Sequence, residues 1–208
     1  MIAVLDYGMG NLHSVTHAMA AVGAVVRVTN RPEDLRAAER IVLPGVGAFG
    51  ECMKNLRSSG LIEPLEEEVL NNGKPFLGIC LGLQVLAREG YELGVHQGLG
   101  WVPASVRRLD VEARGLRVPH VGWNEVKPLT ASPLFIGLPP KPTFYFVHSY
   151  HLIPEDPDLN LAVCEYGVPF TAAIVRRNIC ATQFHPEKSQ QNGLTFLENF
   201  LAWNPDGC

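Results

Sequence analysis

A cysteine flanked by glycines is the first candidate for chemistry in this sequence. It lies in Gly78-Ile79-Cys80-Leu81-Gly82, after an apolar run and before residues at helical spacing, which predicts a sharp strand-to-helix turn with the thiol at its tip. Beside a helix N-terminus, the thiolate of Cys80 would be stabilised and could act as a nucleophile. The pattern also fits an ordinary strand end with a buried cysteine, so the segment alone leaves both interpretations open.

A cysteine nucleophile needs a base, and the base needs a group that orients it. The segment Gln183-Phe184-His185-Pro186-Glu187 offers both, because a strand end would present His185 while the proline turn brings Glu187 to its second ring nitrogen. Alone, the segment could equally contain a structural histidine or two metal ligands. Together with Cys80, it indicates a triad of Cys80, His185 and Glu187.

Acyl transfer also needs backbone N–H groups that stabilise an oxyanion. Pro44-Gly45-Val46-Gly47 ends a predicted strand, at the edge where open α/β sheets place their sites. The flanking glycines would let the N–H of Val46 point toward the site, together with the N–H of Leu81, although a plain tight turn is the alternative. Gly8-Met9-Gly10 lacks both the G-x-G-x-x-G spacing and a P-loop lysine, so nucleotide binding there is disfavoured.

The composition limits the classes of partner. The 208 residues are 47% hydrophobic and 18% charged, which is typical of a compact, well-buried domain. The net charge is −4 and no basic run exceeds a pair, so a nucleic-acid partner is disfavoured. No apolar run approaches the ~18 residues of a membrane span, and the first residues form no cationic leader, so we expect a cytoplasmic protein without a membrane partner.

The cysteines argue against a disulfide framework and against a zinc site. Their number is odd and they form no C-x-x-C pair: Cys52, Cys80, Cys164, Cys180 and Cys208. We expect reduced thiols, of which one or two at most take part in chemistry.

The elements that must position these residues alternate between strands and helices in the first half of the chain. Strands are expected at 2–5, 25–29, 41–43 and 76–79, and helices from residue 12, over 32–38 and over 61–69. Shorter strands are expected later, at 102–109, 117–126, 144–148, 161–165, 171–176 and 179–184, before a last helix around 194–201. The sequence therefore predicts one α/β domain over residues 1–208, with a parallel sheet covered on both faces and antiparallel hairpins in its second half.

The two chemical motifs, G-I-C-L-G-L-Q at 78–84 and Q-F-H-P-E-K-S at 183–189, resemble those of class I glutamine amidotransferases. Segments 6–11, 44–49, 119–124 and 145–150 are similar to the glutaminase subunits of imidazole glycerol phosphate synthase within that family. The motifs follow the family's order from residue 2 to about residue 203, and Leu83 stands where many members have methionine, a volume-conserving change. The resemblance implies an open mixed, largely parallel sheet flanked by helices, flavodoxin-like, and the Cys80–His185–Glu187 triad.

The resemblance also implies roles for further residues. Glutamine binding falls on Gly45, Gly47, Gln84, Ser149 and Tyr150, the oxyanion donors are Val46 and Leu81, and Trp123 and Lys188 lie at a subunit interface. Neither a metal nor an organic cofactor is needed for hydrolysis of glutamine through a thioester on Cys80.

Ammonia released into water is protonated and lost as a nucleophile, so an acceptor enzyme is required. A β/α barrel needs ~250 residues, and the expected elements already use this whole chain. The resemblance implies a separate cyclase barrel that makes imidazole glycerol phosphate and AICAR in histidine biosynthesis. Glycines beside Val46 would let its peptide flip, so we expect glutaminase activity to depend on that partner.

Two alternatives remain at this point. One is an amidotransferase subunit of another pathway, pyridoxal phosphate or anthranilate synthesis. The other is a non-catalytic binding subunit of the same fold.

Overall fold

The computed structural model describes residues 1–205, and Cys208, one of the expected reduced thiols, lies outside them. The strands are β1 (Ile2–Leu5), β2 (Val26–Thr29), β3 (Arg40–Gly45), β4 (Phe76–Cys80), β5 (Glu89–Gly90), β6 (His96–Gln97), β7 (Ala104–Arg108), β8 (His120–Pro128), β9 (Thr143–His148), β10 (Tyr150–Pro154), β11 (Asn160–Tyr166), β12 (Val168–Arg176) and β13 (Ile179–Thr182). The α-helices are α1 (Leu12–Ala21), α2 (Pro32–Ala37), α3 (Phe49–Ser58), α4 (Ile62–Glu66), α5 (Leu81–Gln84) and α6 (Gln190–Ala202). Shorter turns are the π-helical η1 (Glu67–Asn71) and the 3₁₀ turns η2 (Glu112–Arg114), η3 (Pro133–Phe135), η4 (Pro157–Leu159) and η5 (Pro186–Lys188).

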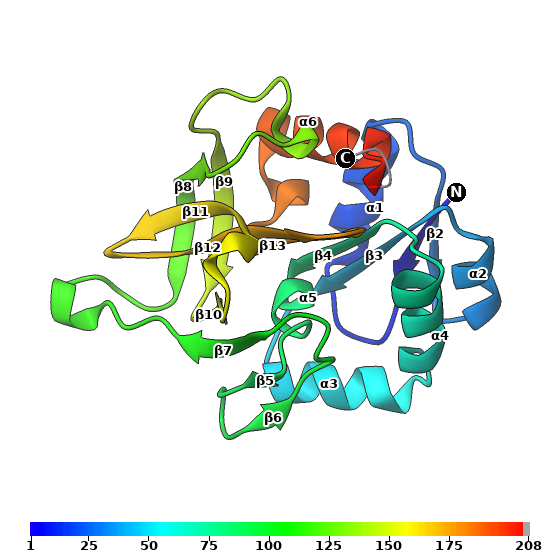
Figure 1. The fold of residues 1–208 in the computed structure, drawn as a ribbon, viewed down its shortest axis with the longest axis horizontal. Helices are drawn as coiled ribbons and strands as arrows, with labels where there is room; N and C mark the ends of the chain where they lie inside the picture. Colours follow the sequence, from blue (N-terminus) through cyan, green and yellow to red (C-terminus); the bar gives the residue numbers. More distant parts are fainter. Residues whose placement is uncertain (206–208) are drawn as a thin grey trace.

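Within residues 1–205 the strands form two sheets (Figure 1). The large sheet has the order β2-β1-β3-β4-β13-β12-β11-β8-β9, and the small one has the order β10-β7-β5-β6. From β2 to β13 the large sheet is parallel, and from β13 through β12 to β9 it is antiparallel. This arrangement confirms the expected mixed α/β fold.

The parallel strands carry apolar side chains on both faces, so the large sheet is covered on both sides. Ala3 and Leu5 belong to a core under α3 and α4, whereas Ile2 and Val4 belong to a second core under α1 and α6. Figure 1 shows α1 and α6 on one side of β3 and β4, and α3 and α4 on the other. Because strand side chains alternate between faces, an unbroken apolar run supplies both cores.

The expected site lies where the central parallel strands end. In the register of the sheet, Gly45 of β3 stands beside Cys80 of β4, and Thr182 of β13 stands beside Ile79. The carboxyl ends of parallel strands lie at one edge, so the loops after Gly45, Cys80 and Thr182 meet there.

Several elements differ from the expectation. Helix α3 and strands β5, β6 and β10 were not expected. The helical segment after Cys80 ends at Gln84 instead of continuing to Ala87, because the carbonyls of residues 85–87 accept hydrogen bonds from the backbone at 99–102. Of the helices in the described residues, none is long and apolar enough to cross a membrane.

The packing of the turn after β4 against β3 predicts a large cost for a side chain at Gly82. A Cβ there would overlap the backbone carbonyl of Leu43. We expect Gly82→Ala to lower the free energy of unfolding by about 3 kcal/mol or more, measured by urea denaturation. Gly115→Ala is the control. Gly115 has φ +75°, but no atom lies within 4 Å of the position that a methyl group would take. Only the strain of the left-handed conformation is therefore added, about 1–2 kcal/mol. Equal losses in the two variants would contradict this interpretation.

Candidate active site

Cys80 is the last residue of β4 and has a backbone conformation that is rare outside glycine, with φ 57° and ψ −106°. A Cβ at Gly78 would lie 2.6 Å from the carbonyl oxygen of Gly82, so only glycine allows the chain to fold back this closely. The thiol of Cys80 is thereby directed into a cavity, and the residue is 7% exposed. The structure has the sharp turn that the spacing predicts.

His185 follows β13, the strand next to β4, and is tightly held. Its Nδ1 lies 2.8 Å from Oε1 of Glu187, and the two side chains are 2% and 1% exposed. Its backbone N–H donates to the carbonyl of Tyr145 at 2.9 Å, and its carbonyl accepts from the hydroxyl of Ser189 at 2.6 Å. With Nδ1 bound to the carboxylate, Nε2 is left without a hydrogen-bond partner within residues 1–205, in the cavity that contains Cys80.

The charges around His185 favour its protonated form. Burial alone would lower the pKa of the imidazole, but the adjacent Cys80 and Glu187 outweigh burial and raise that pKa to about 10. An imidazolium beside a sulfur stabilises the thiolate, which is the reactive form of cysteine.

The other described cysteines lack such a neighbour. Burial raises the pKa of the thiols of Cys52 and Cys164 to about 12, and it raises the pKa of Cys180 as well. These three thiols are therefore protonated at neutral pH. Because they are buried, their role is to pack in the core.

The cavity at Cys80 has a volume of about 260 Å³ and brings most of the expected residues together. The expected residues that line it are Val46, Gly47, Cys80, Leu81, Gln84, Ser149, Tyr150 and His185. Four more were not expected there: Glu92, Pro119, Val147 and His148. Glu187 lies behind His185, while Trp123 and Lys188 lie outside the cavity.

The glycines before and after Val46 do different things. A Cβ at Gly45 would lie 2.8 Å from Cβ of Leu81 and 2.9 Å from the hydroxyl of Tyr7, so Gly45 is needed for close packing and does not line the cavity. Gly47 lines the cavity with φ +97°, a conformation that favours glycine. Val46 is 39% exposed and lines the cavity together with Leu81, whose N–H stands at the start of α5.

Gln84 is buried and its amide nitrogen is fully used. Nε2 donates to the carbonyl of Tyr150 at 2.9 Å and to Oε1 of Gln183 at 3.1 Å. The amide of Gln183 in turn faces Sγ of Cys80 at 3.7 Å. The group that Gln84 can offer to a ligand is therefore its carbonyl oxygen.

Glu92 is a site residue that sequence reasoning missed. It lies between β5 and β6, lines the cavity, and accepts a hydrogen bond at 2.8 Å from the backbone N–H of Phe49 at the start of α3. No local motif marks it, because only the packing of this hairpin against α3 brings its carboxylate to the cavity. A fixed carboxylate there can pair with the ammonium group of an amino acid.

An exposed apolar surface borders the cavity. Val121, Trp123, Tyr145 and Val147, which we call the β8–β9 patch, form the cross-strand pairs Val121–Val147 and Trp123–Tyr145. Val121 is 56% exposed and Trp123 is 48% exposed. Nζ of Lys188 lies 5.8 Å from the ring of Tyr145, so both expected interface residues lie in or beside this patch.

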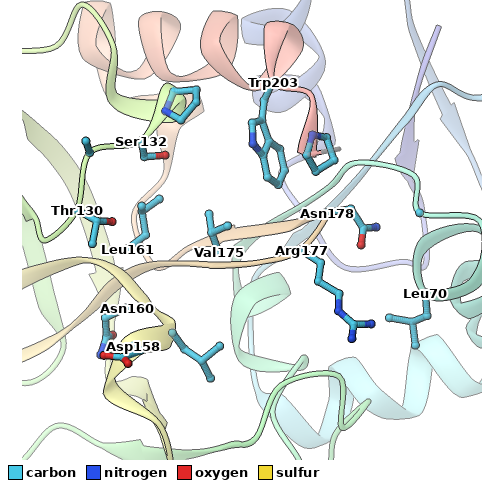
Figure 2. Close-up of a pocket in the computed structure, with 15 residues that line it drawn as sticks. Leu70, Thr130, Ser132, Asp158, Asn160, Leu161, Val175, Arg177, Asn178 and Trp203 are labelled. Atoms are coloured by element: carbon cyan, nitrogen blue, oxygen red, sulfur yellow. The ribbon is translucent and has the colours of Figure 1, made fainter. Parts of the chain in front are cut away.

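A larger cavity of about 700 Å³ lies at the opposite ends of β4 and β13 (Figure 2). Its lining includes Arg177, Asn178 and Trp203, and it contains none of the expected site residues. Within residues 1–205, no cluster of three or more histidine, cysteine or acidic side chains could hold a metal ion.

Comparisons with known proteins identify the family of this chain. The model of the family described as glutamine amidotransferase class-I matches residues 3–203. The chain belongs to the class-I glutamine amidotransferase family. It is 50% identical over 204 residues to a protein of Syntrophotalea carbinolica and 48% identical over 203 residues to one of Geobacter sulfurreducens, both named imidazole glycerol phosphate synthase subunit HisH. These matches cover 96% of this chain in each case, and 98% and 97% of the relatives.

Solved structures share the fold of this chain. PurLQS from Thermotoga maritima superposes with a TM-score of 0.75 at 16% identity, over 97% of each chain. A structure described as a glutamine amidotransferase gives 0.72 at 20% identity, over 96% of this chain and 98% of the other. At these identities the likeness concerns the fold alone, and it confirms the expected class.

The buried histidines near the cavity of this amidotransferase predict an acid-labile fold. Burial lowers the pKa of His148 to about 3 and the pKa values of His120 and His151 to about 4, below the ~6.5 of an unfolded histidine. Below pH 6.5 the unfolded chain binds more protons than the folded one, so stability falls as the pH drops from about 6.5 toward 4.

We expect His148 alone to lower the free energy of unfolding by about 2 kcal/mol as the pH falls from 7 to 5, measured by urea denaturation. This range lies above the titration of ordinary carboxylates, so it isolates the histidines. His148→Gln should remove this share of the pH dependence, and the shares of His120 and His151 should remain. A free energy of unfolding that is constant from pH 7 to pH 5 in the unmodified chain would contradict neutral burial.

Proposed function

We propose that this amidotransferase hydrolyses glutamine at Cys80 and delivers the ammonia to a cyclase subunit of imidazole glycerol phosphate synthase, a separate β/α-barrel chain. One observation carries the proposal: a strained Cys80 shares a cavity with a carboxylate-bound His185, in a chain half identical over its length to proteins named as HisH subunits. We further propose that residues 1–208 act as one domain. The free thiols of the described cysteines support a reducing compartment, the cytoplasm.

The first step is acylation of Cys80. Its thiolate attacks the side-chain carbonyl carbon of glutamine, and the carbonyl oxygen becomes an oxyanion bound by the N–H groups of Leu81 and Val46. The protonated His185 gives its proton from Nε2 to the leaving nitrogen as the C–N bond breaks. Ammonia departs, and a γ-glutamyl thioester remains on Cys80.

The second step is hydrolysis of the thioester. Neutral His185 now takes a proton from water through Nε2, and the hydroxide attacks the thioester carbonyl to release glutamate and the thiolate of Cys80. Glu187 holds the ring through Nδ1 and stabilises its charged form in both steps. Beyond the attack by Cys80 and by water, the two steps need only proton transfers through His185. This is consistent with the proposal that no metal or organic cofactor takes part.

Recognition of glutamine uses the cavity wall. The side-chain carbonyl oxygen of Gln84 and the backbone at Ser149 and Tyr150 bind the polar groups of glutamine. The carboxylate of Glu92 pairs with the α-ammonium group of glutamine. Gly47 leaves room for the substrate beside Val46.

The β8–β9 patch with Lys188 is proposed as the surface that binds the cyclase. Val147 belongs both to this patch and to the cavity lining, so a partner on the patch would close the cavity mouth and receive ammonia directly. A flip of the Val46 peptide at Gly47 would let the partner supply or withdraw an oxyanion donor, worth ~10²–10³ in rate.

The proposal predicts that Cys80→Ala separates two activities. In the complex with the cyclase, glutamine-dependent cyclisation should fall below a percent or so of the unmodified rate because the nucleophile is missing. Cyclisation with added ammonia should stay nearly unchanged, because it does not use this site. Both rates are measured on the same preparation.

Cys164→Ala is the matched control, because this thiol is also buried but lies away from the cavity. It should retain both activities. Glutamine turnover by Cys80→Ala above a percent or so of the unmodified rate would show that another group is the nucleophile.

Substitutions of His185 and of Glu187 should lower the rate of glutamine hydrolysis to different degrees. His185→Asn removes the acid and base and should cost ~10²–10⁴ in the rate of glutamine hydrolysis. Glu187→Gln keeps a hydrogen-bond partner for Nδ1 but loses the charge that stabilises the imidazolium, so the loss should be smaller. Equal losses in single-turnover assays of the complex, or none, would count against these roles.

A further inference from the structure

Two buried histidines face each other at the cavity, and the proposed chemistry uses neither: His148 lines the cavity, whereas His120 does not. His120 in β8 and His148 at the end of β9 are directly opposite in the strand register. Nδ1 of His120 lies 3.0 Å from Nε2 of His148, and the residues are 3% and 6% exposed. A buried polar pair of this kind is expected to act through its hydrogen bonds.

The partners of the two rings fix where the protons lie. Nδ1 of His148 is 2.9 Å from the carbonyl oxygen of Tyr150, which can only accept, so this nitrogen carries the proton. Nε2 of His148 is then an acceptor, and Nδ1 of His120 must donate to it. Burial lowers the pKa of both rings, to about 4 for His120 and about 3 for His148, so both stay neutral at working pH.

The chain of donors ends on the backbone that forms the glutamine side of the cavity. The carbonyl of Tyr150 also accepts from Nε2 of Gln84 at 2.9 Å. The carbonyl of Ser149 accepts from the backbone N–H of Leu109 at 2.9 Å. Residues 149 and 150 are thus held by hydrogen bonds on both sides, one of which originates at His148.

At its other end, the chain begins on the strand that carries the exposed patch. Val121 and Trp123 point outward from β8, while His120 points inward from the same strand. The ring of His120 is stacked on Tyr166, with centroids 4.0 Å apart, and on Phe146, with centroids 5.0 Å apart. His120 therefore has little room to rotate independently, and a shift of β8 would be transmitted to His148.

We propose that His120 and His148 are positioning residues that couple the β8–β9 patch to the glutamine-binding backbone at Ser149 and Tyr150. The partner that binds the patch is a protein, the cyclase. The inference therefore rests on the proposed function. Neither histidine exchanges a proton with glutamine. Each acts by holding the carbonyl of Tyr150, and with it the wall that the substrate meets.

The test compares two substitutions of His120 in the complex with the cyclase. His120→Phe keeps the stacked ring but removes the donor, and leaves Nε2 of His148 unpartnered. We expect KM for glutamine to rise about tenfold, the loss of roughly one hydrogen bond, while kcat changes less than threefold. His120→Asn places an amide nitrogen near the position of Nδ1 and should restore KM to within about threefold of the unmodified value.

His151→Phe is the matched control. His151 is a neighbouring histidine in β10 whose buried Nδ1 has no hydrogen-bond partner among the described residues, so its loss breaks no bond to the wall. KM should stay within about twofold of the unmodified value, the spread expected of a change that removes no hydrogen bond. An unchanged KM in His120→Phe, or equal increases in the two phenylalanine variants, would overturn the proposal.

A second measurement does not depend on activity. Amide hydrogen exchange at Leu109, which donates to Ser149, should accelerate about tenfold in His120→Phe and stay unchanged in His151→Phe. Unchanged exchange in His120→Phe would overturn the positioning role. If the exchange result holds but the unmodified complex hydrolyses no glutamine, the proposed function fails and the hydrogen-bonded coupling stands.

Discussion

The turn at Cys80 is the constraint on which the site depends. A non-glycine residue with φ 57° is strained by ~1–3 kcal/mol, and such a conformation persists only where the surroundings enforce it. Here β4 is central in the large sheet, paired with β3 and β13 and buried on both faces. Glycines at 78 and 82 allow the chain to fold back on itself, and Gly82 also lies directly against the backbone of β3. The sheet therefore fixes the position of the thiol before any substrate binds.

The antiparallel half of the sheet supplies the other constraint, because His185 and Glu187 are buried and must be held where they lie. The backbone N–H of His185 is bound by β9 through Tyr145, and its carbonyl is bound by Ser189. Strand β9 ends at His148, and the backbone just beyond it, at Ser149 and Tyr150, lines the cavity. One strand thus supports both His185 and the cavity wall, and its outer face is the proposed docking patch.

Local patterns were enough to predict the turn at Cys80 and the contact between His185 and Glu187. The glycines around Cys80 act within four residues of one another, and His185 and Glu187 are two residues apart, so their geometry is encoded in short segments. Helix α3 was also visible in principle, because Phe49, Cys52, Met53 and Leu56 have helical spacing and are buried. The short α5, the position of Glu92 and the His120–His148 pair depend on contacts between distant segments, which no local pattern contains.

The central claim is that Cys80 alone is the nucleophile toward glutamine, and covalent labelling tests it most directly. A chloroketone analogue of glutamine would be incubated with the complex of this chain and the cyclase, and the labelled peptides would be identified by mass spectrometry. We predict one label per chain, on Cys80, slowed by glutamine and accompanied by loss of glutamine-dependent but not ammonia-dependent cyclisation. Labelling of a different cysteine with the same loss, or labelling of Cys80 without any loss, would contradict the account.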